Sequence, residues 1–469
     1  MSIPNLRPLL VVGVSLLFFS CGFTASGDGN GAFLVRDIYP GSPSSSPAYM
    51  ISVNNNVFFR LYYEPNGNDG LWKSDGTPEG TIMLKAGGPM NFARFGNLVV
   101  FEESIPWRSD GTKAGTFALA NNNAGGACFF VEAGGILFFS GNSYDGRELW
   151  RSDGTSAANT YVVKDINPGT ADSYAAPVAS VNGVLFLYAD DGVHGCKELW
   201  KSDGTEAGTV LVRDINPGAS PSIVAGSYRP YSEFQGQFFF AATDGVHGRE
   251  LWKSDGTASG TVMVKDINPG IADAFVGQTG AFTRACNKLL FVAVDGVHGR
   301  ELWVTDGTEQ GTFMVKDINP GAGDGGGLVL IPLNDFLCFN ASSPDYGREL
   351  WRTDGTENGT YLLKDICPGP GGSWPGGVCA QGRLYFHAND GGAYGRELWT
   401  SDGTPEGTFR LADINPGPAG SYPYDFAEAN GLLLFAADDG VHGEELWAIP
   451  LLPYPKAPAS AQSAWWRRY

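Results

Sequence analysis

Short apolar segments alternate with Gly-, Asn- and Asp-rich turns along most of the chain, and their periodicity is that of β-strands. One stretch shows the pattern in full, with strands predicted at residues 177–181, 184–189, 198–202 and 209–215 and a hairpin turn at Asn182-Gly183. The second strand is apolar on both faces, whereas the fourth is apolar only at alternate positions. We therefore expect the fourth strand to lie outermost, with one face in solvent, and the second strand to be buried.

This stretch is one copy of a repeat. Each copy contains Glu-Leu-Trp, a polar pair, Asp-Gly-Thr, Gly-Thr, an apolar run and Lys-Asp-Ile-Asn-Pro-Gly. The tryptophans of the copies are Trp72, Trp107, Trp150, Trp200, Trp252, Trp303, Trp351, Trp399 and Trp447. The first two copies are short and degenerate, because Trp107 follows Pro106 instead of Glu-Leu and neither copy has the Asp-Ile-Asn-Pro-Gly ending.

Four antiparallel strands in about 50 residues are typical of one blade of a β-propeller. We predict an all-β fold, a single closed β-propeller of about nine four-stranded blades over residues 32–449. Eight blades is the alternative, if the two short copies do not both form full blades. The ring should close by pairing of an N-terminal strand (32–38) with a C-terminal strand (445–449), which removes two exposed sheet edges. Seven of the tryptophans, Trp150, Trp200, Trp252, Trp303, Trp351, Trp399 and Trp447, are expected to pack between adjacent blades.

The repeated phrase resembles the ELWxxDGT repeat family of bacterial exported proteins, over about residues 32–449. The resemblance implies a propeller-like repeat domain. It implies no established activity.

The net charge of the chain limits the kinds of partner that we expect. The 469 residues carry a net charge of −19, so the surface repels phosphate backbones and we expect no nucleic acid. Cations, basic proteins and neutral sugars stay open as partners. We expect a monomer.

The N-terminus predicts export. An 11-residue apolar run, 9–19, follows Arg7 and is too short to span a membrane. Residues 1–21 are therefore assigned as a signal peptide, followed by a linker at 22–31, and residues 450–469 as a Pro/Ala-rich tail. Ser20-Cys21-Gly22 resembles a lipoprotein cleavage site, with Cys21 as the lipidated residue; ordinary signal cleavage nearby is the alternative. The predicted location is the cell envelope or the extracellular space, with membrane contact only through a lipid on Cys21.

Seven cysteines are scattered without metal-ligand spacing, so a zinc cluster is not expected. Cys367 and Cys379 flank a Pro/Gly-rich loop, and an oxidising compartment would permit a disulfide between them.

Antiparallel strand order sorts the loops onto two faces. The first face carries the Asp-Gly-Thr turns, in which Asp accepts hydrogen bonds from its own turn. A calcium-binding rim is the alternative on this face, and no other cofactor is expected.

The second face carries the loops between the second and third strands and the blade-to-blade crossovers. It holds our candidate ligand-binding residues, which are His194, His247, His298, His442, Tyr346, Tyr394, Tyr228, Tyr231, Trp374, Tyr422 and Tyr424. Aromatic side chains that differ from copy to copy are typical of contact residues for a sugar ring or a protein.

The sequence lacks the motifs of common catalytic sites. The Glu before each Leu-Trp should form a weak exposed pair with the preceding Arg or Lys, as in Arg249-Glu250. Our leading hypothesis is a non-catalytic binding or adhesion module for a glycan or an extracellular protein. A polysaccharide hydrolase or lyase with its site in the central funnel and a purely structural envelope protein are the alternatives.

Overall fold

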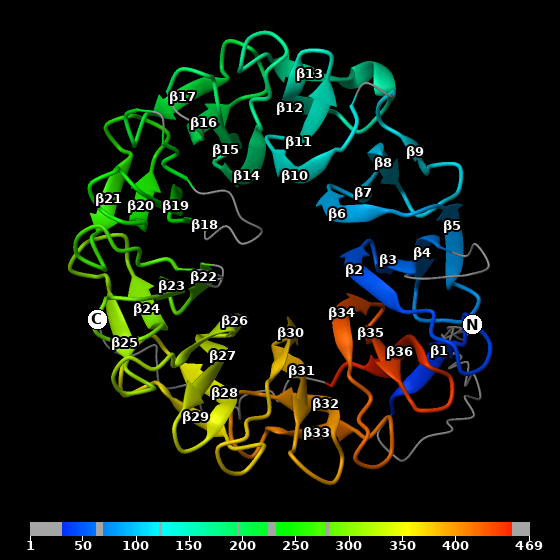
Figure 1. Ribbon diagram of the computed structural model, residues 1–469. Helices are drawn as coiled ribbons and strands as arrows, with labels where there is room; N and C mark the ends of the chain where they lie inside the picture. Colours follow the sequence, from blue (N-terminus) through cyan, green and yellow to red (C-terminus); the bar gives the residue numbers. More distant parts are fainter. Residues whose placement is uncertain are drawn as a thin grey trace, which may run out of the picture.

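The computed structural model describes residues 31–61, 69–121, 124–194, 197–218, 220–223, 231–276 and 282–452. These residues form nine four-stranded antiparallel sheets arranged in a ring (Figure 1). The prediction of a β-propeller is confirmed, and so is the count of nine blades. Both short N-terminal copies form complete sheets, although the last strand of the second sheet has two residues. Within the described part of the chain, the one helical element is a 3-10 turn, Ala157–Asn159.

The strands of blades 1 to 5 are β2 (Pro47–Val53), β3 (Asn56–Leu61), β4 (Gly70–Ser74) and β5 (Ile82–Ala86); β6 (Met90–Phe95), β7 (Leu98–Glu103), β8 (Ile105–Ser109) and β9 (Phe117–Ala118); β10 (Cys128–Ala133), β11 (Ile136–Ser143), β12 (Gly146–Ser152) and β13 (Thr160–Lys164); β14 (Ala176–Val181), β15 (Val184–Ala189), β16 (Glu198–Ser202) and β17 (Val210–Arg213); and β18 (Tyr231–Phe234), β19 (Gln237–Ala242), β20 (Glu250–Ser254) and β21 (Val262–Lys265). Those of blades 6 to 9 are β22 (Thr283–Ala285), β23 (Lys288–Ala293), β24 (Glu301–Thr305) and β25 (Phe313–Lys316); β26 (Gly326–Leu333), β27 (Phe336–Ser343), β28 (Gly347–Thr353) and β29 (Tyr361–Lys364); β30 (Gly376–Ala380), β31 (Arg383–Asn389), β32 (Arg396–Ser401) and β33 (Phe409–Ala412); and β34 (Tyr424–Ala429), β35 (Leu432–Asp438), β36 (Glu444–Pro450) and β1 (Phe33–Arg36).

The two ends of the propeller share blade 9. Strand β1 pairs antiparallel with β36, with Phe33 opposite Ala448 and Leu34 opposite Trp447. Figure 1 shows this junction where the blue and red ends of the ribbon meet. The predicted ring closure is therefore confirmed, and the edges of β1 and β36 that face each other are both paired.

Within each blade the first strand lies nearest the centre of the ring and the fourth lies at its rim (Figure 1). The tryptophan of each third strand packs against the preceding blade. Trp252, for example, shares a buried cluster with Phe186 and Leu199 of blade 4. The equivalent clusters contain Trp150, Trp200, Trp303, Trp351, Trp399 and Trp447. The predicted inter-blade packing of these residues is confirmed.

Long cationic side chains also join neighbouring blades. Lys164 at the end of β13 donates to the backbone oxygen of Thr209 in the next blade at 2.9 Å, and Lys265 reaches Thr312 in the same way at 2.9 Å. The polar pattern of the fourth strand predicted that its outer face lies in solvent, but the structure shows that this face also makes contacts. It supplies hydrogen bonds between blades.

The glutamates before Leu-Trp correct a prediction. Glu250 is fully buried and pairs with backbone amides rather than with Arg249. Its Oε2 accepts from the amide of Ile267 at 2.6 Å and its Oε1 from the amide of Ala274 at 3.2 Å. Glu148, Glu198, Glu397 and Glu445 accept the equivalent pair of amides. Glu349 accepts the amide of Ile366 and the hydroxyl of Ser373, and Glu301 accepts the amides of Ile318 and Asn319. We call these seven residues the glutamate clamps, since each ties a blade-to-blade crossover at two points to the third strand.

The predicted disulfide between Cys367 and Cys379 is wrong for this structure, in which both are free. Cys367 lies in a crossover, where its amide donates to the clamp Glu349 at 3.0 Å. Cys379 lies in β30 and packs in the core between blades 7 and 8. One cysteine is thus held in the crossover and the other packs in the core, and no bond joins the two thiols.

No helix in the described ranges is long and apolar enough to cross a membrane. The predicted signal peptide with Cys21, nearly all of the linker, and residues 453–469 of the tail lie outside the described residues.

Candidate functional site

In the Asp-Gly-Thr turns of the first face, each Asp carboxylate accepts hydrogen bonds from its own turn. Asp203 Oδ1 accepts from the backbone amide of Thr205 at 2.9 Å and from its hydroxyl at 2.7 Å. The same pair of bonds recurs in the turns of Asp75, Asp110, Asp153, Asp255, Asp306, Asp354 and Asp402. Hydrogen bonding to Thr205 holds the pKa of Asp203 below its usual value. This uniform chemistry is that of turn formation.

Over the part of the chain that the structure covers, no group of three or more His, Cys, Asp or Glu side chains could hold a metal ion. Each of blades 1 to 8 has one Asp-Gly-Thr aspartate, and blade 9 has none. The structure therefore offers no positive support for the calcium alternative.

The four histidines of the second face are held by their own loops. His194 Nδ1 lies 2.7 Å from Asp191 Oδ2, and the backbone amide of His194 donates to Asp191 Oδ1 at 2.9 Å. His247, His298 and His442 repeat this arrangement with Asp244, Asp295 and Asp439 at 2.7 to 2.9 Å. The hydrogen bond to Asp191 raises the pKa of His194 above its usual value. These histidines shape the loop tips, and the Nε2 of His298 also lies 3.9 Å from Asp317 Oδ2.

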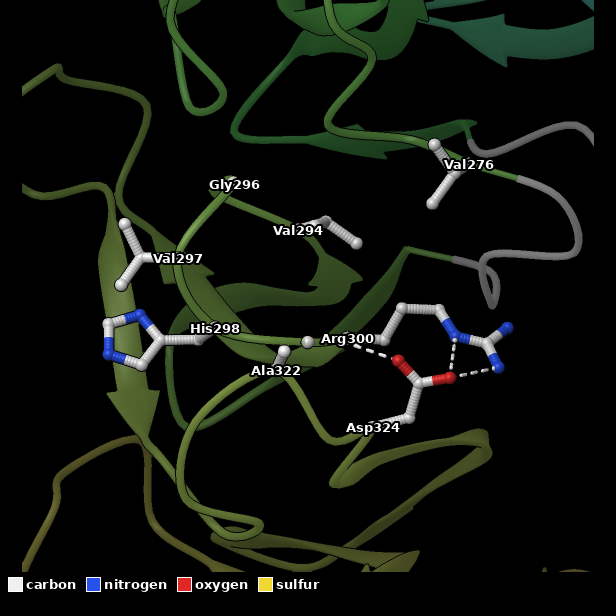
Figure 2. A pocket seen from close by; sticks show the side chains of 9 residues that line it. Val276, Val294, Gly296, Val297, His298, Arg300, Ala322 and Asp324 are labelled. Atoms are coloured by element: carbon white, nitrogen blue, oxygen red, sulfur yellow. Dashed lines mark hydrogen bonds and ion pairs between the residues drawn. The ribbon is translucent and has the colours of Figure 1, made fainter.

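A depression of about 510 Å³ lies beside one of these loops (Figure 2). Its walls include Val276, Val297, His298, Arg300 and Asp324. Figure 2 shows the Arg300 guanidinium facing the Asp324 carboxylate, and the two groups lie 2.6 Å apart at their closest. The principal charges of this depression are thus already paired with each other.

Two predicted aromatic residues stand exposed where a crossover enters an innermost strand. Trp374 precedes β30 and is 50% exposed; Tyr422 precedes β34 and is 57% exposed. Both have left-handed backbone conformations, with φ of 54° and 49°. That conformation is uncommon outside glycine and indicates a local requirement.

The glutamate clamps position these aromatics. Ser373 donates its hydroxyl to Glu349 at 2.6 Å, and Ser421 does the same to Glu397 at 2.6 Å. The amide of Trp374 donates to the backbone oxygen of Arg348 at 3.2 Å. At the other end of the crossover the amide of Ile366 also donates to Glu349, at 3.0 Å, so the ring of Trp374 is carried by a backbone that is bonded to β28 at both ends.

A third aromatic occupies the equivalent position and was not predicted. Tyr174 follows Ser173, precedes β14, is 51% exposed and has φ of 47°. The signal was present as the sequence Asp-Ser-Tyr, which matches Gly-Ser-Trp and Gly-Ser-Tyr in the later copies. The crossovers of blades 3, 7 and 8 therefore carry the same exposed feature.

The other predicted aromatics are placed differently. Tyr231 lies in β18 and packs against Phe238, with ring centroids 6.1 Å apart. Tyr424 lies in β34, half-buried, and its hydroxyl donates to Glu444. Both residues are half-buried and engaged in these contacts, so they expose less of their rings than Trp374 and Tyr422 do.

Two further tyrosines lie in the loops between second and third strands. Tyr346 is exposed, and Tyr394 lies beneath the guanidinium of Arg410 with 3.2 Å between the guanidinium carbon and the ring centroid. Tyr228 lies outside the described residues. The fifth histidine, His387, is packed in β31, where burial lowers its pKa to about 4 and the charge of Arg396 contributes.

No family model and no curated protein matches this sequence. Among solved structures, puromycin hydrolase is similar at 16% identity and a TM-score of 0.40, with 74% of this chain and 58% of that chain covered. The computationally designed Ika8 protein is similar at 11% identity and a TM-score of 0.42, covering 87% and 98%. BamB from Moraxella catarrhalis is similar at 12% identity and a TM-score of 0.41, covering 77% and 96%. The chain thus spans less than two thirds of puromycin hydrolase. These low similarities say nothing about function.

Proposed function

We propose that this protein is an exported, non-catalytic binding module that recognises a glycan with the second face of its propeller. The observation that carries the proposal is the set of exposed aromatics at one crossover position, Tyr174, Trp374 and Tyr422. Their rings lie on the surface. Their backbones have positive φ, a conformation that costs a non-glycine residue about 1–3 kcal/mol. At the equivalent position after blade 5 the ring of Phe275 is buried in the core, so the exposure of the ring is what distinguishes the other three crossovers.

A sugar is the ligand that best fits such rings. The C–H groups of a pyranose present a flat apolar face that stacks on an aromatic side chain, while its hydroxyls stay hydrated. Trp374 and Tyr422 belong to neighbouring crossovers, so a chain of sugars could contact both. A protein partner would be expected to need a larger continuous apolar patch around its anchor residues.

The test is binding of the whole protein to an array of neutral and acidic polysaccharides, followed by the double variant Trp374→Ala/Tyr422→Ala. We expect the variant to lose most of the binding and to keep the thermal stability of the parent protein. The matched control is Tyr161→Ala, because Tyr161 is 49% exposed but lies on the outermost strand β13.

Three outcomes would contradict the proposal. Binding that survives the double variant would place the ligand elsewhere. Equal loss in Tyr161→Ala would show a general effect of exposed aromatics. Release of new reducing ends or unsaturated sugars from a bound polymer would favour the hydrolase or lyase alternative.

A further inference from the structure

The residue before each glutamate clamp is a cation in six consecutive blades. These residues, from blade 3 to blade 8, are Arg147, Lys197, Arg249, Arg300, Arg348 and Arg396. Because each is followed by a clamp at the same point of the third strand, all six lie on the second face at equivalent places. In blade 9 the position is occupied by Glu444.

In blades 5 and 6 this cation is neutralised. Arg249 Nε lies 2.9 Å from Asp273 Oδ2, and a terminal nitrogen of Arg300 lies 2.6 Å from Asp324 Oδ2. Each aspartate stands 24 residues after its arginine and also accepts a hydrogen bond from that arginine's backbone amide. The aspartate is thus the built-in counter-ion of this position.

In blades 7 and 8 the counter-ion is missing from the sequence. The residues 24 positions after Arg348 and Arg396 are Gly372 and Gly420. Within the described ranges neither arginine forms an ion pair, and the carboxylate that acts on Arg348, Asp324, is already paired with Arg300. Here the guanidinium instead lies over an exposed ring, 4.6 Å from the centroid of Trp374 for Arg348 and 5.7 Å from that of Tyr422 for Arg396.

The two features coincide on neighbouring blades. Each of these blades joins an exposed aromatic ring to a cation that has lost its carboxylate, in a protein whose net charge is −19. An uncompensated cation in such a surface attracts an anionic group. A guanidinium binds a carboxylate through two parallel hydrogen bonds, whereas the ring beside it takes the flat face of a sugar.

From this we infer that blades 7 and 8 bind an acidic polysaccharide, with its sugar rings on Trp374 and Tyr422 and its carboxylates on Arg348 and Arg396. The inference rests on the proposed function and specifies the ligand class of the same site. Uronate polymers carry a carboxylate on every sugar, and this repetition matches two equivalent sites on successive blades.

The experiment uses two polymers with one backbone, polygalacturonate and its fully methyl-esterified form, together with a panel of neutral polysaccharides. We expect the whole protein to bind polygalacturonate at least about tenfold more tightly than the ester, as one charge-assisted hydrogen bond provides. The double variant Arg348→Gln/Arg396→Gln should bind the two polymers equally. Arg348→Lys/Arg396→Lys, which keeps the charge, should keep most of the preference.

The matched control is Arg249→Gln, because Arg249 occupies the same position in blade 5 and is neutralised by Asp273. It should leave the preference unchanged. Equal binding of both polymers by the parent protein, or a preference that survives Arg348→Gln/Arg396→Gln, would overturn the inference while leaving the proposed glycan binding intact. Failure to bind either polymer or any member of the panel would overturn both.

Discussion

Replacing Glu250 with alanine perturbs the device that joins one blade to the next. In the native protein its carboxylate is fully buried and accepts the amides of Ile267 at 2.6 Å, Ala274 at 3.2 Å and Asn268 at 3.4 Å. Alanine leaves these donors unpaired inside the protein. An unsatisfied buried donor costs about 1–3 kcal/mol. For the two shorter bonds together, we expect the free energy of unfolding to fall by about 2–6 kcal/mol.

Glutamine at the same position should cost less than alanine. Its side-chain oxygen can still accept, but its NH₂ group cannot, so we expect about half of the alanine effect, roughly 1–3 kcal/mol. The matched control is Glu309→Ala, since Glu309 is an exposed residue of an Asp-Gly-Thr turn. Its replacement should change stability by no more than about 0.5 kcal/mol.

The assay is denaturant unfolding of parent and variants, followed by tryptophan fluorescence and by circular dichroism so that partial unfolding would be seen. The competing interpretation, an exposed pair of Arg249 and Glu250, predicts a loss of about 0–1 kcal/mol. A Glu250→Ala midpoint that coincides with that of Glu309→Ala would refute the clamp.

Three further predictions follow from the same structure. Burial raises the pKa of Glu198, Glu250 and Glu301 to about 7 from an ordinary value of 4.5, so the folded protein holds these protons more tightly than the unfolded chain. Their stabilising effect is full below pH 4.5 and is lost as the pH rises through 7, so the melting temperature should fall from pH 5 to pH 8 and fall less in Glu250→Gln; an increase over that range would contradict the pKa direction. Trp303→Ala removes a ring packed between blades 5 and 6 and should cost about 3–5 kcal/mol in denaturant unfolding, against less than about 1 kcal/mol for the exposed Tyr361→Ala. Ile38→Ala should cost about 2 kcal/mol and speed hydrogen exchange in β36, because Ile38 seals the join between blades 9 and 1; unchanged exchange there would argue against closure by β1.

The ring could be predicted because its determinants are local and repeated. Every copy contains its own turn residues and strand periodicity. The incomplete first and last copies together supply the strands of one blade. The tryptophans could be placed for a similar reason, since a large apolar side chain in a half-buried strand must find a neighbour.

The glutamate clamps could not be predicted, because their partners are backbone amides. Glu250 is bonded to residues 17 to 24 positions further along, and an amide has no sequence signature. The adjacent Arg249 offered a more obvious partner, and the sequence could not show that this arginine turns instead to Asp273. The burial of the Glu250 carboxyl group depends on the path of the crossover, which only the structure shows.

The site on blades 7 and 8 lies between these two cases. Glycine in place of aspartate at 372 and 420 is visible in the sequence, but its meaning depends on the contact that Asp273 and Asp324 make in other blades. Once that contact is known, the repeats act as internal controls, since the blades share one backbone and differ in a few exposed side chains. The crossover itself requires glycine at positions 372 and 420, because both have positive φ, 83° and 77°, and a Cβ there would lie 2.5 Å from the backbone nitrogen of Arg348 or Arg396. Blade 4 also lacks the aspartate, which is replaced by Pro221, but the residue after its Ser222 is the buried Ile223. Blades 7 and 8 are successive and each combines an arginine without its carboxylate with an exposed ring, and a shared ligand accounts for that combination.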